Sequence, residues 1–76
     1  MTELDFCKDF AYNLAREIEM SGYSHYEVAE RSYLDESTLN KLLKGYRTPS
    51  VRTVVNLSLT LECDITDLIS YEDYIN

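Results

Sequence analysis

The chain has 76 residues, of which 45% are hydrophobic and 28% charged, and its formal net charge is −7. This length corresponds to a single small domain over residues 1–76, and the composition is that of a globular protein. Two cysteines are too few for a disulfide framework or a zinc site. No apolar run approaches the roughly 18 residues that a membrane span needs, and no signal-peptide pattern is visible. We therefore expect a cytoplasmic protein with no membrane contact.

The first predicted element is a helix over residues 3–20. An apolar residue recurs at every fourth position and forms one stripe: Phe6, Phe10, Leu14 and Ile18. The pair Ser21-Gly22 predicts the end of this helix, because glycine takes the left-handed conformation of a helix C-terminus without steric cost.

Two short helices are predicted next, over residues 25–32 and 36–44. Ser24 starts the first of them through a capping box with Glu27, in which each side chain accepts a hydrogen bond from the backbone amide of the other residue. Asp35 is a good N-cap for the second. The side chains that these helices are expected to bury are small or apolar: Val28, Ala29, Leu39, Leu42 and Leu43.

Gly45 ends the third helix, and Pro49-Ser50 opens a fourth. The apolar residues that this fourth helix offers to the core are Val51, Val54, Val55, Leu57 and Leu61. Asp64 can cap a short fifth helix with three apolar residues: Ile65, Leu68 and Ile69. Residues 69–76 form a C-terminal tail without a clear assignment. Helices joined by such short connections predict a compact all-α bundle of five helices.

Charge is divided unevenly along the chain. Residues 37–61, the acid-free segment, contain no Asp or Glu but hold four basic residues: Lys41, Lys44, Arg47 and Arg52. All 14 acids lie outside this segment, together with the remaining basic residues: Lys8, Arg16 and Arg31. A local concentration of positive charge favours a polyanionic partner even where the net charge does not.

The second and third helices carry the pattern of a helix-turn-helix. Ala29 supplies the small residue needed where the two helices cross, and Leu34 supplies the apolar residue of the turn. Over residues 24–69 the chain resembles the XRE family (lambda-repressor-like, Cro/C1-type). The matching positions are Ser24, Glu27, Ala29-Glu30, Ser37-Thr38, Gly45, Arg47 and Pro49-Ser50, with the closing apolar pattern Leu61, Ile65 and Leu68.

The resemblance implies a transcriptional regulator of repressor type that binds double-stranded DNA sequence-specifically as a homodimer. The third helix would lie in the major groove, and the candidate base-reading residues are Glu36, Ser37, Asn40, Lys41 and Lys44. The candidate phosphate-binding residues are Arg16, His25, Thr38, Arg47 and Thr48. Side-chain chemistry fits some of these roles, because Asn40 can pair with adenine, Lys41 with guanine, and Glu36 with the cytosine amino group.

The chain departs from the family pattern at three places. Tyr33 stands where the turn usually has a glycine, and a positive φ there would cost about 1 kcal/mol. Asp35 and Glu36 put two acids at the entry to the third helix, and Ile18 stands where the first helix often carries an arginine. With the net charge, these departures leave open a second function: a protein-interaction module of the same fold, antitoxin-like or anti-repressor-like.

No pattern indicates an enzyme. The single histidine has no cysteine or serine at a spacing that favours nucleophilic catalysis, and the carboxylates are scattered over predicted helix surfaces. No glycine-rich phosphate loop is present. We therefore expect no catalytic residue, no metal, no cofactor and no small-molecule ligand.

Overall fold

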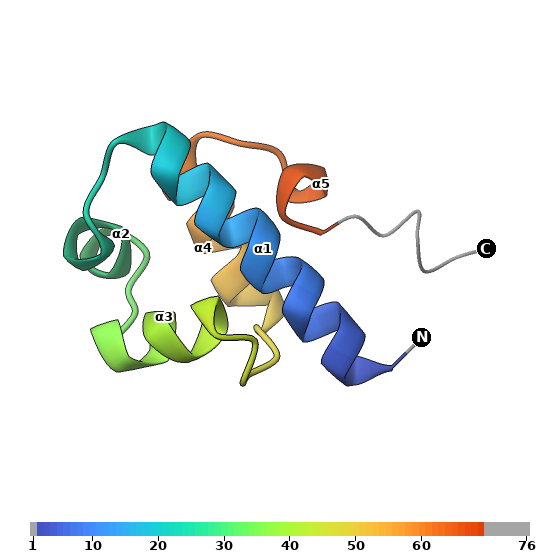
Figure 1. Cartoon of the computed structure of the whole chain (residues 1–76). Helices are drawn as coiled ribbons and strands as arrows, with labels where there is room; N and C mark the ends of the chain where they lie inside the picture. Colours follow the sequence, from blue (N-terminus) through green and yellow to red (C-terminus); the bar gives the residue numbers. More distant parts are fainter. Residues whose placement is uncertain (1, 70–76) are drawn as a thin grey trace.

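The computed structural model describes residues 2–69, which form five helices. They are α1 (Glu3–Ser21), α2 (His25–Arg31), α3 (Glu36–Leu43), α4 (Val51–Leu61) and α5 (Ile65–Leu68). In Figure 1, α1 crosses the front of the bundle with α4 behind it, while α2 and α3 lie on one side and α5 on the other. Residues 2–69 contain no strand, and the predicted all-α class is confirmed. None of these helices combines the length and apolar character needed to cross a bilayer.

The helix starts follow the predicted caps with one exception. The Ser24 hydroxyl accepts from the Glu27 amide at 3.1 Å, and the Glu27 carboxylate accepts from the Ser24 amide at the same distance. The Ser50 hydroxyl accepts from the Thr53 amide at 3.1 Å and so caps α4. Asp35 occupies the N-cap position of α3, but its side chain makes no capping hydrogen bond. That part of the prediction is wrong, and the Asp35 carboxylate instead remains exposed at the start of α3.

Gly22 ends α1 in the left-handed conformation (φ 78°), as the sequence predicts. Three further helices, α2, α3 and α4, end with one left-handed residue and share a hydrogen-bond pattern. These residues are Tyr33 (φ 60°), Gly45 (φ 73°) and Glu62 (φ 53°). The next residue in each case donates its amide to a carbonyl five positions earlier: Leu34 to Ala29 at 2.8 Å, Tyr46 to Lys41 at 3.0 Å, and Cys63 to Ser58 at 3.0 Å. This is the Schellman arrangement, and glycine adopts it without the steric cost that a side chain brings. The turn before α3 therefore keeps the positive φ that the family pattern implies, with a tyrosine in that position.

All five helices contribute to one core. Its buried members are Phe10, Leu14, Ile18, Val28, Ala29, Leu39, Leu42, Val54, Leu57, Leu61 and Leu68. The prediction that Val51 joins this core is wrong, because 81% of its surface is exposed. Its neighbour Arg52 is exposed as well, so the first turn of α4 extends past the packed part of the bundle. Ile65 is likewise 45% exposed, which leaves Leu68 as the side chain that anchors α5.

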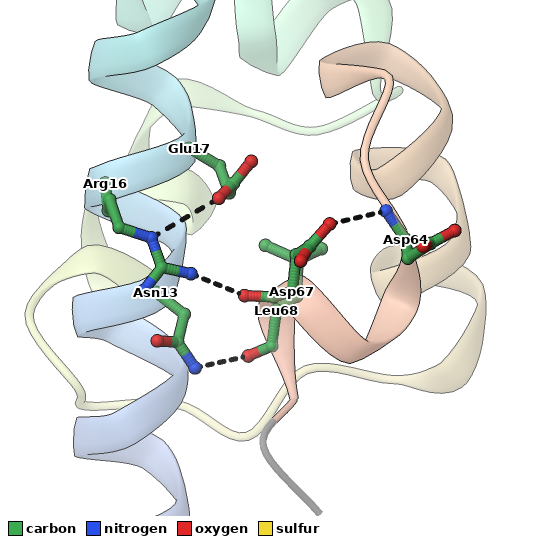
Figure 2. Close-up of polar contacts among 6 residues, drawn as sticks. All are labelled: Asn13, Arg16, Glu17, Asp64, Asp67 and Leu68. Atoms are coloured by element: carbon green, nitrogen blue, oxygen red, sulfur yellow. Dashed lines mark hydrogen bonds and ion pairs between the residues drawn. The ribbon is translucent and has the colours of Figure 1, made fainter.

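Side chains of α1 hold the short helix α5 in place (Figure 2). The buried Asn13 amide donates to the Leu68 carbonyl at 3.0 Å, and the Arg16 guanidinium donates to the Asp67 carbonyl at 2.9 Å. A helix of one turn leaves its last carbonyls without partners in the helix. These two bonds satisfy them and fix α5 against α1.

Candidate nucleic-acid interface

The exposed face of α3 carries all five candidate base-reading residues. Leu39 and Leu42 are buried on the opposite face of this helix, with 0% and 1% of their surfaces exposed. The outward-facing residues are Glu36, Ser37, Asn40, Lys41 and Lys44, and all of them are exposed. Lys44 is the C-cap of α3, so this surface extends over the full length of the helix. The structure therefore brings these five side chains together on one uninterrupted polar face.

A hollow of about 320 Å³ lies beside this face, between the turn before α3, α3 itself, the loop that follows it and the start of α4. Its wall includes one acid, Asp35. Three of the candidate phosphate-binding residues, Thr38, Arg47 and Thr48, line it. Ser50 and Thr53 add two further hydroxyl groups to its wall. Hydroxyl groups and a guanidinium can all donate hydrogen bonds to an anion. The arrangement thus suits a phosphate group placed next to the helix that would read the bases.

The loop after α3 is attached to the first turns of α1. The Thr48 hydroxyl donates to the Glu3 carboxylate at 2.6 Å, and the Cys7 sulfur lies 3.3 Å from the same hydroxyl oxygen. The backbone also approaches closely, since a Cβ added at Gly45 would lie 3.6 Å from the carbonyl oxygen of Cys7 and from the Cα of Lys8. The position of this loop relative to α3 is therefore set by α1.

Sequence reasoning missed two residues that α1 brings to this loop. Lys8 packs next to Gly45, although it belongs to the acidic part of the chain. Glu3 brings a negative charge to Thr48. Both residues lie more than 35 positions away from the loop along the chain. No local pattern in the sequence links them to it.

The entry to α3 has the opposite chemistry. Glu30, Asp35 and Glu36 line one shallow hollow together with Tyr26. The Glu30 carboxylate accepts a hydrogen bond from the Tyr26 hydroxyl and raises the pKa of Tyr26, and the charge of Glu36 raises it further. The structure thus gathers acids from α2, the turn and α3 at the entry to α3.

Two candidate phosphate-binding residues lie apart from the hollow that contains Arg47. His25 is the exposed first residue of α2, and it lines a different hollow with Leu43 of α3 and residues at the end of α1. The Arg16 guanidinium is held by the Asp67 carbonyl at 2.9 Å and by the Glu17 carboxylate at 3.3 Å (Figure 2). Arg16 is therefore directed towards α5 and takes part in helix packing.

One group of potential metal ligands occurs among the described residues. Ligand atoms of Glu17, Cys63 and Asp67 lie within 4.8 Å of one another. Burial raises the pKa of the Cys63 thiol to about 11, and the charges of Glu17 and Asp67 add to the shift. A metal requires the thiolate, so a thiol that stays protonated at neutral pH is a poor ligand. The guanidinium of Arg16 already brings a positive charge to Glu17.

Comparisons with known proteins agree with this geometry. A family model described as helix-turn-helix matches residues 14–68. Among solved structures, the restriction-modification controller protein C.AhdI from Aeromonas hydrophila superimposes with a TM-score of 0.79 at 24% sequence identity, over 83% of this chain and 96% of that chain. No curated protein matches the chain. Because the family model covers well over half of its residues, the chain belongs to the XRE-type helix-turn-helix family of DNA-binding transcription regulators.

Proposed function

We propose that this protein binds a specific double-stranded DNA sequence by placing α3 in the major groove. One observation carries the proposal: the exposed face of α3 lies directly beside the hollow lined by Thr38, Arg47 and Thr48. Phosphate contacts position a protein on the duplex, and contacts to base edges specify the sequence. A helix that offers both kinds of contact side by side is suited to sequence-specific binding.

The base-reading residues have distinct roles in this proposal. Asn40 pairs with adenine through two hydrogen bonds, and Lys41 donates to the O6 and N7 atoms of guanine. Glu36 accepts from the amino group of cytosine. The Ser37 hydroxyl can donate to a base acceptor or accept from a base donor. Lys44 lies at the end of the helix, where it can reach a guanine or a phosphate. All five side chains are exposed on the outer face of α3.

Phosphates are held on both sides of the helix. Arg47, Thr38 and Thr48 take one phosphate in the hollow between α3 and the loop that follows it. His25 donates to another phosphate from the start of α2, where its side chain is exposed. We leave Arg16 out of this set, because α5 and Glu17 already take up its guanidinium.

The proposed binding unit is a homodimer. A single α3 of 8 residues spans only about two helical turns and can reach few base pairs. Two copies related by a two-fold axis would place their α3 helices in successive major grooves about 34 Å apart. Regulation would then follow from occupancy of an operator that contains two inverted half-sites.

Selection of bound sequences from a random duplex pool at two salt concentrations tests this proposal. We expect enrichment of an inverted repeat with half-site centres about 10 base pairs apart. With about four to six phosphate contacts, log K should fall with log salt at a slope near −4 to −5. Absence of duplex binding at low salt would rule the proposal out.

A second candidate function rests on the acidic entry to α3. Glu30, Asp35 and Glu36 surround Tyr26, in a chain of net charge −7. Such a surface repels phosphate and suits a basic protein partner, as in an antitoxin-like or anti-repressor-like module. The same selection experiment separates the two functions, since an interaction module of this kind would enrich no duplex sequence at any salt concentration.

A further inference from the structure

One of the proposed phosphate donors is already in use. The Thr48 hydroxyl donates its hydrogen bond to the Glu3 carboxylate at 2.6 Å. This distance is typical of a hydrogen bond from a hydroxyl to a charged acceptor, which is stronger than a bond between neutral groups. Both residues are exposed, so the bond lies where a DNA phosphate would approach the hollow.

The direction of the hydrogen bonds around Thr48 is fixed by its chemistry. A threonine hydroxyl has a single proton, and here that proton points to Glu3. The Cys7 thiol, 3.3 Å away and only 5% exposed, must then be the donor to the Thr48 oxygen. The thiol therefore holds the oxygen from the buried side, while the proton faces the surface.

We propose that Glu3 occupies the position of a DNA phosphate on Thr48, so that DNA binding exchanges a carboxylate oxygen for a phosphate oxygen. This inference rests on the proposed DNA binding of the α3 face. A carboxylate and a phosphate accept the same hydrogen bond from a hydroxyl, and both are anions. Glu3 thereby competes with DNA. It lowers the affinity for every sequence alike, since phosphate contacts carry no sequence information.

The other contacts of this segment indicate that the Glu3 carboxylate competes with DNA and is not needed to hold the loop. Gly45 and Tyr46 donate their amides to the carbonyls of α3 in the Schellman arrangement. The Ser50 cap holds the other end of the loop on α4, and Gly45 packs against the backbone of α1. None of these contacts involves the Glu3 side chain. Replacing its carboxylate by a neutral group should therefore weaken the hydrogen bond to the Thr48 hydroxyl and leave the loop in place.

The test is a double-mutant cycle on duplex DNA of the selected sequence. Wild type, Glu3→Gln, Thr48→Val and the double variant are compared at low and high salt. We expect Glu3→Gln to bind about three- to tenfold more tightly, because the glutamine amide oxygen can still accept from Thr48 but is a neutral and weaker acceptor than the carboxylate. A gain should remain at high salt, because the weaker hydrogen bond to Thr48 is not screened, whereas the part of the gain that comes from the lost negative charge is. In the Thr48→Val background this remaining gain should disappear.

Two control variants separate the hydrogen bond from the charge. Glu3→Asp keeps the charge, and keeps an acid in the first turn of α1, but shortens the side chain by one methylene, so it should gain affinity too. Asp9→Asn removes an exposed acid from the same helix. It should have a smaller effect that vanishes at high salt, where charge interactions across solvent are screened.

Each remaining outcome contradicts the inference. Equal or weaker binding by Glu3→Gln would mean that the carboxylate supports the loop. A gain that disappears at high salt, or that survives in the Thr48→Val background, would mean that Glu3 acts only through its charge. If wild type and all variants fail to bind DNA, the proposed function itself is wrong; binding without a Glu3 effect overturns only the competition.

Discussion

The two ends of α3 are built on the same backbone arrangement but differ in charge. The chain enters α3 through Tyr33 in the left-handed conformation, and acids at positions 35 and 36 follow. It leaves through Gly45 in the same conformation, and Arg47 follows. The exit is also packed against α1, whereas three acids line a hollow at the entry. The hollow of Arg47 runs along α3 from one end to the other, because Asp35 and Thr38 line it together with Arg47.

This difference suggests that the two ends of α3 contribute differently to DNA binding. In the proposed binding mode, positive charge at the exit would supply affinity for any duplex, because the phosphate backbone is the same at every sequence. Negative charge at the entry would repel phosphate and would be tolerated only where a base donor compensates for it. A surface that opposes wrong partners as well as attracting the right one gains specificity at the expense of affinity. The boundary between the two kinds of charge lies within α3, since the acid-free segment begins directly after Glu36.

The largest expected effect comes from removing the charges of the exit. The double variant Lys44→Ala, Arg47→Ala should lose about 3 kcal/mol or more of binding free energy, because each charged hydrogen bond contributes about 1.5–3 kcal/mol. The loss should be the same for the selected and for random sequences. The slope of log K against log salt should become less steep, by about 2. Fluorescence anisotropy titrations at three salt concentrations measure both quantities.

Arg52→Ala is the matched control for this pair. Arg52 belongs to the same acid-free segment and is exposed, but it lies on α4 and outside the hollow of Arg47. Its removal should leave the salt slope nearly unchanged. A slope that falls equally in the control would show that the segment acts through its overall charge and that the exit has no special role.

The next largest effect concerns a base contact between the two ends. Asn40→Ala should cost about 1–3 kcal/mol for the selected site and relax the preference at one base pair. Binding to random duplexes should hardly change, since an amide is uncharged. Selection repeated with the variant shows which position becomes degenerate. If no position does, or if random binding falls as well, the face of α3 is misplaced in the proposal.

Much of the fold could be predicted because it is recorded in local patterns. Capping at Ser24 and Ser50 and the glycine at position 45 gave helix boundaries that the structure reproduces within one residue. Exposure of Val51 could not be predicted in this way, because periodicity gives the buried side of a helix but not how far along it the neighbouring helices extend.

The candidate site was predictable only where it lies on one stretch of chain. The face of α3 follows from helical periodicity, and the structure reproduces it. The bonds of Thr48 to Glu3 and Cys7 join segments more than 40 positions apart, which no local pattern encodes. Arg16 is predicted as a phosphate ligand because it is the basic residue near Ile18, where the family often has an arginine. Its bond to the backbone of α5 depends on the packing of two helices.

A smaller effect is expected at the acidic entry. Glu36→Gln should raise the affinity for random duplexes by about 1 kcal/mol or less, the size of one charge interaction across solvent at close range. The gain should shrink with added salt, and any preference for cytosine at one position should weaken. Glu19→Gln is the control: this exposed acid lines the hollow of His25 and not the hollow at the entry to α3, so its removal should leave the preference for cytosine unchanged. Unaltered binding by Glu36→Gln would separate the entry from the DNA surface.

The smallest expected effect concerns a substitution that places a glycine at the left-handed position before α3, as Gly45 stands at the one after it. Tyr33→Gly should raise the free energy of unfolding by about 0.5–1 kcal/mol, because the steric cost of the left-handed conformation is removed while the unfolded chain gains some entropy. Little packing is lost, since 87% of the Tyr33 surface is exposed. Urea denaturation should show a higher midpoint with an unchanged m value. Glu62→Gly should also raise the free energy of unfolding, because Glu62 has a positive φ too. Gly45→Ala should lower it, since a residue with a side chain would then have to adopt a φ of 73°. Should Tyr33→Gly instead destabilise the protein, contacts of the tyrosine ring must outweigh the strain at this turn.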